Sequence, residues 1–420
     1  MNNQLLPPML EGQSLLDALQ ILPKYDSSIR THSKAERLIA LNDLYNIYLP
    51  NEMSVEIYSK IYLATLRSLS KKGTHLATMQ RNENGKYLTR QQKQSIDYQG
   101  IIGGADTFSI IGASGIGKSS AISRSIQLIS NSMIELENPY CKVIPCLVVQ
   151  CPYDCSLRGM LLAILKHTDE MLGNTHFEKA VRQRATVDTL IGTVSQLALN
   201  HIGLLVVDEI QNVVANRNGR QLVAMLTQLI NNAGISICMV GTSQCLPFFE
   251  SVDYLARRSL GLQYGTLPFD TYFKNFCKCV FEHQYTQKES NLTEAVLQFL
   301  YENSGGVLAN VITMLHDAQE IAILNNVEEL NLATLKTASD NRMAMLKPHI
   351  KKTRLKQTTT TTPAASTKKT VPCQSLTQPI DDTWSISGTA FYAKNNNADM
   401  VSLLKKKVSV IELPLKGVSV

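Results

Sequence analysis

The segment with the strongest chemical signature is Gly112–Ser119, which reads G-x-x-x-x-G-K-S. It follows the apolar run Phe108–Ile111 and precedes a helical stretch, which is the context that this motif requires. Its glycines allow a turn whose backbone N–H groups all point at one anion, and the next helix adds the positive end of its dipole. We therefore predict a triphosphate site formed by Ser114, Gly115, Ile116, Gly117, Lys118, Ser119 and Ser120.

Two residues of this loop have separate chemical roles. Lys118 would bring a positive charge to the β and γ phosphates, and the Ser119 hydroxyl would be a ligand of Mg²⁺. A second signal, Leu204–Glu209, places two carboxylates after four apolar residues. Asp208 would end a buried strand beside the phosphate loop and complete the Mg²⁺ site with Ser119.

Glu209 is the residue that indicates the reaction. A second carboxylate beside the metal-binding one can orient and deprotonate an attacking water, which the metal-bound Asp208 cannot also do. One further strand fits between the two motifs, and the chain lacks the N/TKxD motif that reads guanine. The pattern therefore favours ATP hydrolysis over phosphoryl transfer to a metabolite.

A third signal is the apolar run Ile235–Gly241, which ends in small polar residues. The hydroxyl of Thr242, or as second choice that of Ser243, would reach between the carboxylate-bearing strands and hold the water near the γ-phosphate. Glu209 and Thr242 are thus predicted to act in catalysis from neighbouring strand ends.

Short β-branched runs alternate with longer helical stretches through the middle of the chain, which predicts a parallel α/β sheet. We expect five strands, at 107–112, 142–150, 203–208, 235–241 and 261–267, with helices at 118–133, 156–172, 177–200 and 218–232. An amphipathic helix is expected over 55–70, with Ile57, Ile61, Ala64 and Leu69 on one face.

Length and composition allow two or three domains and a large core in these 420 residues. Nine cysteines exclude a disulfide scaffold and fit a reducing compartment. Cys151 and Cys155, with Cys141 and Cys146 nearby, lack paired zinc-ligand spacing and are expected to be packing residues. No signal peptide or membrane-length apolar run is evident, so we expect a cytoplasmic protein with no membrane partner.

The net charge of +6 is unevenly distributed. Residues 347–370 carry seven cations and no acid, and 347–380 as a whole is basic, then Thr-rich over 358–362, then Pro-containing, a composition that cannot bury enough apolar area to fold. We expect a disordered basic linker over 347–380 and an extended docking segment over 381–420, around Trp384 and 408–413. The basic tail suits a polyanion or an acidic partner, and a merely solvated linker fits equally well.

The order of these motifs resembles the AAA+ ATPases and, more narrowly, the TnsC/TniB transposition regulators. The resemblance covers roughly residues 100–330, and it rests on four segments: GASGIGKS at 112–119, LLVVDEIQN at 204–212, VGTSQ at 240–244 and LARRS at 255–259. It implies an AAA+ core over 101–270, a small helical lid over 271–346 and a mainly helical, partner-binding region over 1–100.

Such a resemblance implies ATP-dependent rings or helical filaments around duplex DNA. They would link a target selector of the TnsD/TniQ kind to transposase subunits of the TnsA/TnsB kind. An arginine of one protomer would complete the site of the next and make hydrolysis depend on assembly. Arg257 and Arg258 both lie where that arginine is expected, and the sequence does not choose between them.

The same resemblance suggests DNA contacts and one departure. Pore-lining positions on the helices after the second strand match Arg158, Lys179, Arg182, Arg184 and Thr186, although an ordinary polar helix face is an equal alternative. Asn310 stands where many AAA+ lids carry a phosphate-facing arginine, so slow turnover is expected. Two other functions remain open: a replication-initiator or helicase-loader ATPase, and a nucleotide-gated signalling switch that does not bind nucleic acid.

Overall fold

The computed structural model describes residues 6–72, 107–129, 133–137, 140–250, 261–345 and 347–350, all within the compact unit Met1–Leu355. Its centre is a six-stranded sheet with the order β2-β3-β4-β5-β1-β6. The strands are β1 (Thr107–Gly112), β2 (Ile134–Glu137), β3 (Tyr140–Gln150), β4 (Ile202–Asp208), β5 (Ser236–Gly241) and β6 (Leu262–Tyr264). All pairs are parallel except β2–β3.

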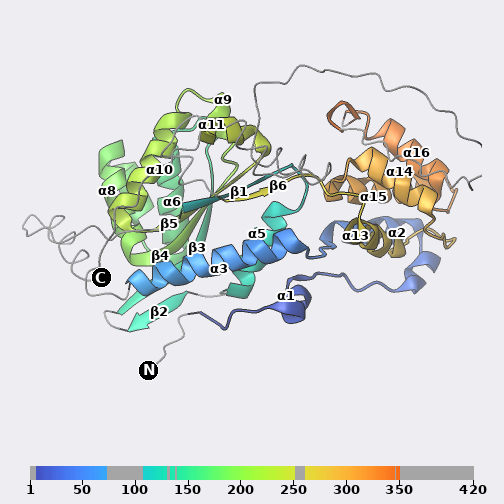
Figure 1. Cartoon of the computed structure of the whole chain (residues 1–420), viewed down its shortest axis with the longest axis horizontal. Helices are drawn as coiled ribbons and strands as arrows, with labels where there is room; N and C mark the ends of the chain where they lie inside the picture. The colour runs from blue at the N-terminus through green and yellow to red at the C-terminus, as the bar shows by residue number, and fades with distance from the viewer. Residues whose placement is uncertain are drawn as a thin grey trace, which may run out of the picture. The chain divides into compact units, whose positions relative to one another are not determined.

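The sheet is covered on both faces, as a parallel sheet of this kind requires. Along β4, Leu204 and Val206 enter one core, and Leu205 and Val207 enter the other. The first core lies under α3 (Glu52–Lys72) and α5 (Lys118–Ile129). The second lies under α6 (Leu157–Leu172), α8 (Val187–His201) and α10 (Gly219–Ala233) (Figure 1).

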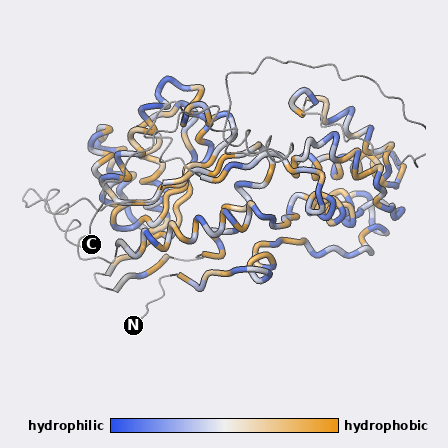
Figure 2. Tube along the Cα trace, in the orientation of Figure 1, coloured by the Kyte–Doolittle hydropathy of each residue, from blue (hydrophilic) through white to orange (hydrophobic). Residues whose placement is uncertain are grey.

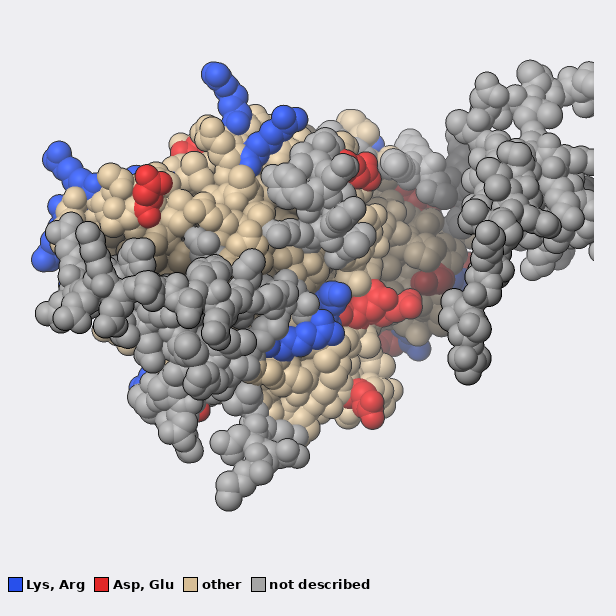
Figure 3. All heavy atoms as spheres, turned by 60° about the vertical axis from the view of Figure 1, so that its left-hand side comes forward, with Lys and Arg blue, Asp and Glu red and all other residues tan. Residues whose placement is uncertain are grey.

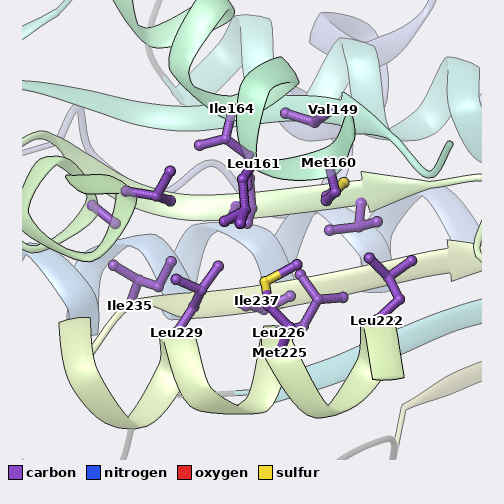
Figure 4. Close-up of a cluster of buried hydrophobic side chains, with 14 of the residues drawn as sticks. Val149, Met160, Leu161, Ile164, Leu222, Met225, Leu226, Leu229, Ile235 and Ile237 are labelled. Carbon is purple, nitrogen blue, oxygen red and sulfur yellow. The ribbon is translucent and has the colours of Figure 1, made fainter. Parts of the chain in front are cut away.

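The hydrophobic residues gather accordingly along the strands and the helix faces that meet them (Figure 2). Figure 4 shows part of the second core, in which Met160, Leu161 and Ile164 of α6 and Leu222, Leu226 and Leu229 of α10 belong to one buried cluster with side chains of the strands. All six side chains are at most 1% exposed. This packing holds the strand ends, which carry the predicted chemistry, in a fixed arrangement.

Residues 6–72 form a strap that contacts both the sheet domain and the helical domain formed by residues 271–350. Helix α1 (Gly12–Leu19) and α3 pack on the sheet, while η1 (Ser27–Thr31), α2 (Lys34–Ala40) and η2 (Leu41–Asn46) lie at the helical domain. Ile21 and Tyr48 exchange two backbone hydrogen bonds of 2.9 Å where the strap turns back. The strap therefore joins two cores that are distant in sequence.

The helical domain consists of four helices: α13 (Thr271–Glu282), α14 (Glu294–Ser304), α15 (Leu308–Leu324) and α16 (Leu332–Asn341), followed by η4 (Lys347–His349). Its core contains Phe273, Phe276 and Leu315, and it also takes in Leu41 and Leu44 of the strap. Among the described helices, none alone is long and apolar enough to cross a membrane, and the bent pair α14–α15 meets that test only by length and composition.

The predicted fold class, α/β with a parallel sheet, a helical lid and a mainly helical N-terminal region, is confirmed for the described residues. All five expected strands are present, and the helix predicted over 55–70 is α3, with Ile57, Ile61, Ala64 and Leu69 at most 2% exposed. The edge strand β2, antiparallel to β3, was not predicted. The linker 347–380, apart from 347–350, and the segment 381–420 lie outside the described residues.

One predicted helix is wrong. The stretch 177–200 is two helices, α7 (His176–Arg182) and α8. Arg184 between them has a positive φ of 49°, a backbone conformation that no helix accommodates, and Thr186 starts a new helix by accepting from Thr189 N. The helix expected over 118–133 is α5, which is described up to Ile129, and residues 130–132 lie outside the described residues.

Candidate nucleotide-binding site

The predicted phosphate, metal and catalytic residues meet in one pocket at the carboxyl edge of the sheet. The pocket has a volume of about 280 Å³. Its lining comes from the loop after β1, the turn after β4, the end of β5 and the start of α15: Ser114, Gly115, Gly117, Lys118, Ser119, Ser120, Asp208, Glu209, Gln211, Gly241, Thr242 and Ala309. The side chain of Ile116 instead enters the core, so only its backbone N–H remains a candidate for phosphate.

The loop after β1 has the backbone that an anion site needs. Gly115 and Gly117 have φ angles of +78° and +98°, which favour glycine. A Cβ on Gly115 would lie 2.9 Å from Val307 Cγ1 and 3.1 Å from Ala309 Cβ, so the helical domain closes against the loop. Ala309 N also donates to Gly115 O at 3.1 Å. The sequence at 115 is thus constrained both by backbone conformation and by the lid.

Lys118 is a buried cation without a carboxylate partner in the described part of the chain. Its Nζ donates to Gly112 O at 3.0 Å and to Ala113 O at 2.8 Å, and its residue is 8% exposed. Burial lowers the pKa of Lys118, while the charges of Asp208 and Glu209 act in the opposite direction. A phosphate anion would supply the partner that this ammonium group lacks.

Ser119 and Asp208 are arranged as a pair of oxygen ligands. Ser119 Oγ lies 3.5 Å from Asp208 Oδ2, and Asp208 Oδ1 accepts from Glu209 N at 2.8 Å. A hydroxyl and a carboxylate oxygen are ligands that Mg²⁺ accepts together with phosphate oxygens and waters. The residues therefore fit the metal predicted from the sequence.

Glu209 and Thr242 face the pocket from adjacent strands. Glu209 has a φ of +57°, an uncommon value for a residue with a side chain, and its carboxylate is exposed. Thr242 Oγ1 is buried and has no hydrogen-bond partner among the described residues. A buried hydroxyl without a partner costs free energy, so its position indicates a ligand or water at this point.

The helical domain brings no cation into this lining. Ala309 is its contribution, and Asn310 Nδ2 donates to Ser304 O at 3.1 Å, which caps the preceding turn. Among the described lining residues, Lys118 is the single cation beside two carboxylates. MgATP is itself a dianion, so a further positive charge would have to come from elsewhere.

Comparison with known proteins supports this interpretation of the core. The family model described as bacterial TniB protein matches residues 104–260. The predicted resemblance to the TnsC/TniB regulators is thereby confirmed over those residues. No curated protein matches the chain.

Similar solved structures include Orc1 of Aeropyrum pernix in complex with DNA, at a TM-score of 0.42 and 16% identity over 63% of this chain and 65% of that one. Orc2 of the same organism, in ADPNP–ADP complexes, has a TM-score of 0.39 and 15% identity over 63% and 66%. Domain III of Thermotoga maritima DnaA has a TM-score of 0.34 and 14% identity over 65% and 92%. The chain covers slightly less than two thirds of either Orc protein.

The five predicted DNA-contact residues do not share one environment. Lys179, Arg182 and Arg184 are exposed on α7 and the turn that follows it, and Arg182 has Glu178 at 3.6 Å. Arg158 is half-buried and donates to Ala185 O, so it tethers this turn to α6. Thr186 caps α8. On the face shown in Figure 3, Lys and Arg side chains are interspersed with Asp and Glu.

Arg257 and Arg258, the predicted trans arginines, lie outside the described residues, although the TniB match includes them. The partner predictions for the basic tail lie outside as well.

Sequence reasoning missed Gln211. Its Nε2 donates to Glu209 Oε2, and its Oε1 accepts from Thr242 N at 3.2 Å. The residue stands inside the segment LLVVDEIQN, but only the pairing of β4 with β5 brings it to Thr242.

Proposed function

We propose that this TniB-type protein is an ATPase whose ATP-bound form assembles on duplex DNA and regulates transposition. The observation that supports it most is the single pocket in which Lys118, Ser119, Asp208, Glu209 and Thr242 meet. ATP and Mg²⁺ are the cofactors that this arrangement fits. Target-selector and transposase subunits are the partners that the family resemblance implies.

Hydrolysis would use the pocket residues in distinct roles. Lys118 and the backbone N–H groups of 114–120 would bind the phosphates, and Ser119 and Asp208 would hold Mg²⁺, which when bound would neutralise phosphate charge. Glu209 takes a proton from water as the water oxygen bonds to the γ-phosphorus. The bond from that phosphorus to the β–γ bridging oxygen then breaks, and ADP leaves. Thr242 would keep the water and the γ-phosphate in register.

The shortage of positive charge in the pocket supports an assembled state. One described cation faces a dianionic ligand and two carboxylates, so the developing charge of the transition state is poorly compensated within one protomer. We assign the missing charge to Arg257 or Arg258 of a neighbouring protomer. Hydrolysis would then be slow in the single chain and stimulated by assembly.

Duplex DNA would be held by its phosphates, which makes binding sensitive to salt and insensitive to sequence. Lys179, Arg182 and Arg184 are the candidates with exposed side chains, while Arg158 and Thr186 would act by fixing the turn that carries them. The Glu178–Arg182 pair is exposed at both ends and is a weak competitor for a phosphate group.

The terminal regions are assigned by layout. The N-terminal region 1–100 would bind the target selector. It would use the surface that faces away from the cores of this chain, because α1, α2 and α3 already pack on those cores. The segment 381–420, tethered by 347–380, would recruit transposase. The core 101–270 and the lid 271–346 would together form the nucleotide-dependent unit.

Electron microscopy of the full chain with duplex DNA tests the proposal, with and without a non-hydrolysable ATP analogue. We expect rings or filaments with the analogue, and with ATP for Glu209→Gln, because the altered chain binds ATP without cleaving it. Glu250→Gln, an exposed carboxylate in α11 (Leu246–Glu250), should behave as the unaltered protein. Single particles under every nucleotide and DNA condition would instead support a signalling switch.

A further inference from the structure

Gln211 connects the two residues to which we assign catalytic roles. It lies in the turn after β4, and its side-chain amide uses both ends: Nε2 donates to Glu209 Oε2, and Oε1 accepts from Thr242 N at 3.2 Å. The side-chain amide of Gln carries a donor and an acceptor on separate atoms without a net charge, so it can bridge two different groups. The bridge therefore joins the carboxylate after β4 to the backbone at the end of β5.

The surrounding backbone makes room for this bridge. A Cβ on Gly241 would lie 2.9 Å from Gln211 Oε1 and 2.7 Å from Ile210 Cγ2, so a side chain there would collide with the turn. Ile210 N donates to Val240 O at 2.9 Å, which fixes the turn against β5. Glu209, just before, keeps its left-handed φ of +57°. Such a conformation persists where the neighbouring contacts over-determine it.

The contact with Glu209 does more for orientation than for stability. Glu209 is exposed, so its carboxylate could be solvated by water and needs no protein donor to offset burial. What the Gln211 amide adds is a direction for that carboxylate, set relative to Thr242. A purely structural bridge between the turn and β5 would require only the Oε1 contact.

We propose that Gln211 positions Glu209 for attack on ATP, by holding its carboxylate in register with the end of β5 that senses the γ-phosphate. The inference rests on the proposed ATPase function. In this role Gln211 acts through Glu209 and not by direct contact with the reacting atoms.

Steady-state hydrolysis by the full chain with duplex DNA tests the role, using two variants of similar size. Gln211→Met removes both hydrogen bonds, and we expect kcat to fall about 10- to 100-fold while KM and ATP affinity stay within twofold. An ionised Gln211→Glu side chain offers Glu209 no donor and adds a second negative charge beside it, so kcat should fall at least as far as in Gln211→Met.

The matched control is Gln244→Met, which removes an exposed amide two residues beyond Thr242. It should leave kcat unchanged. If Gln211 were structural only, both variants would lower the thermal midpoint, and kcat per nucleotide-binding site would be unaltered. That result would overturn the role of Gln211 alone. Absence of hydrolysis in the unaltered chain, with ATP, Mg²⁺ and DNA present, would overturn the ATPase function and this inference with it.

Discussion

Two buried cations, Arg37 in the strap and Lys118 in the pocket, differ in what surrounds them. The Arg37 guanidinium donates to both carboxylate oxygens of Glu328, at 2.6 and 2.8 Å, and to Tyr285 O at 2.9 Å. Lys118 donates only to two carbonyls of its own loop. Both residues are at most 8% exposed.

The difference separates a structural ion pair from a binding site. Arg37 joins α2 to the helical domain, and its charge is compensated there, although its Nε has no partner among the described residues. The hydrogen bond from Arg37 lowers the pKa of Glu328. Lys118 lies near two carboxylates but pairs with neither, and burial lowers its pKa. Removing one partner of a buried ion pair destabilises the fold, whereas a buried cation without an opposite charge is placed to bind an anion.

The largest effect is expected at the compensated site. Arg37→Ala leaves Glu328 buried without its cation and should lower the free energy of unfolding by about 3–5 kcal/mol. The double variant Arg37→Met/Glu328→Leu replaces the pair by apolar groups and should recover most of that loss. Chemical denaturation followed by circular dichroism measures both, and equal losses in the single and double variants would contradict the pairing.

The same pair predicts an acid dependence. Because the pKa of Glu328 is lower in the folded state, its contribution is present above the ordinary carboxyl range and is lost as pH falls through the folded-state pKa. The double variant should lack this part of the acid sensitivity, which makes it the control for the assignment.

The next effect concerns the uncompensated cation. Lys118→Ala should weaken ATP binding by roughly 100-fold, since a charge-assisted contact to phosphate is lost. Its thermal midpoint should not fall, because the ammonium group was buried without an opposite charge. Isothermal titration calorimetry measures the affinity for ATP, and thermal denaturation measures the midpoint. The control is Lys336→Ala, which removes an exposed lysine of α16. A lowered midpoint together with unchanged affinity would reverse the roles of the two cations.

The sequence predicted the pocket well because its parts are local patterns. The phosphate loop, the carboxylates of Asp208 and Glu209 and the hydroxyl of Thr242 each follow a recognisable strand, and parallel strands bring their carboxyl ends to one edge. Two of the features that it missed depend on contacts across the chain. Arg37 and Glu328 are 291 residues apart, and Gln211 meets Thr242 only through the neighbouring strand.

The division of the stretch 177–200 could not be predicted for a different reason. Its apolar positions continue with helical spacing through the turn, so periodicity alone predicts one helix. The break depends on the positive φ of Arg184 and on the carbonyl of Ala185, which Arg158 of α6 fixes from outside. The tertiary contact decides the boundary there.

The smallest effect is expected at the Thr242 hydroxyl. Removing this one oxygen should slow hydrolysis without lowering stability, which is the clearest distinction between a functional and a structural group. Thr242→Val keeps the shape of the side chain and removes a buried hydroxyl that has no partner in the described structure. Stability should be unchanged or higher by up to about 1 kcal/mol, while hydrolysis falls roughly 10-fold. Thr168→Val is the matched control, since Thr168 Oγ1 donates to Ile164 O at 2.7 Å and its loss should destabilise the protein without slowing hydrolysis. If Thr242→Val were the destabilising change of the two, the Thr242 hydroxyl would have a structural role. Its polar group would then be satisfied within the protein, as the charge of Arg37 is by Glu328.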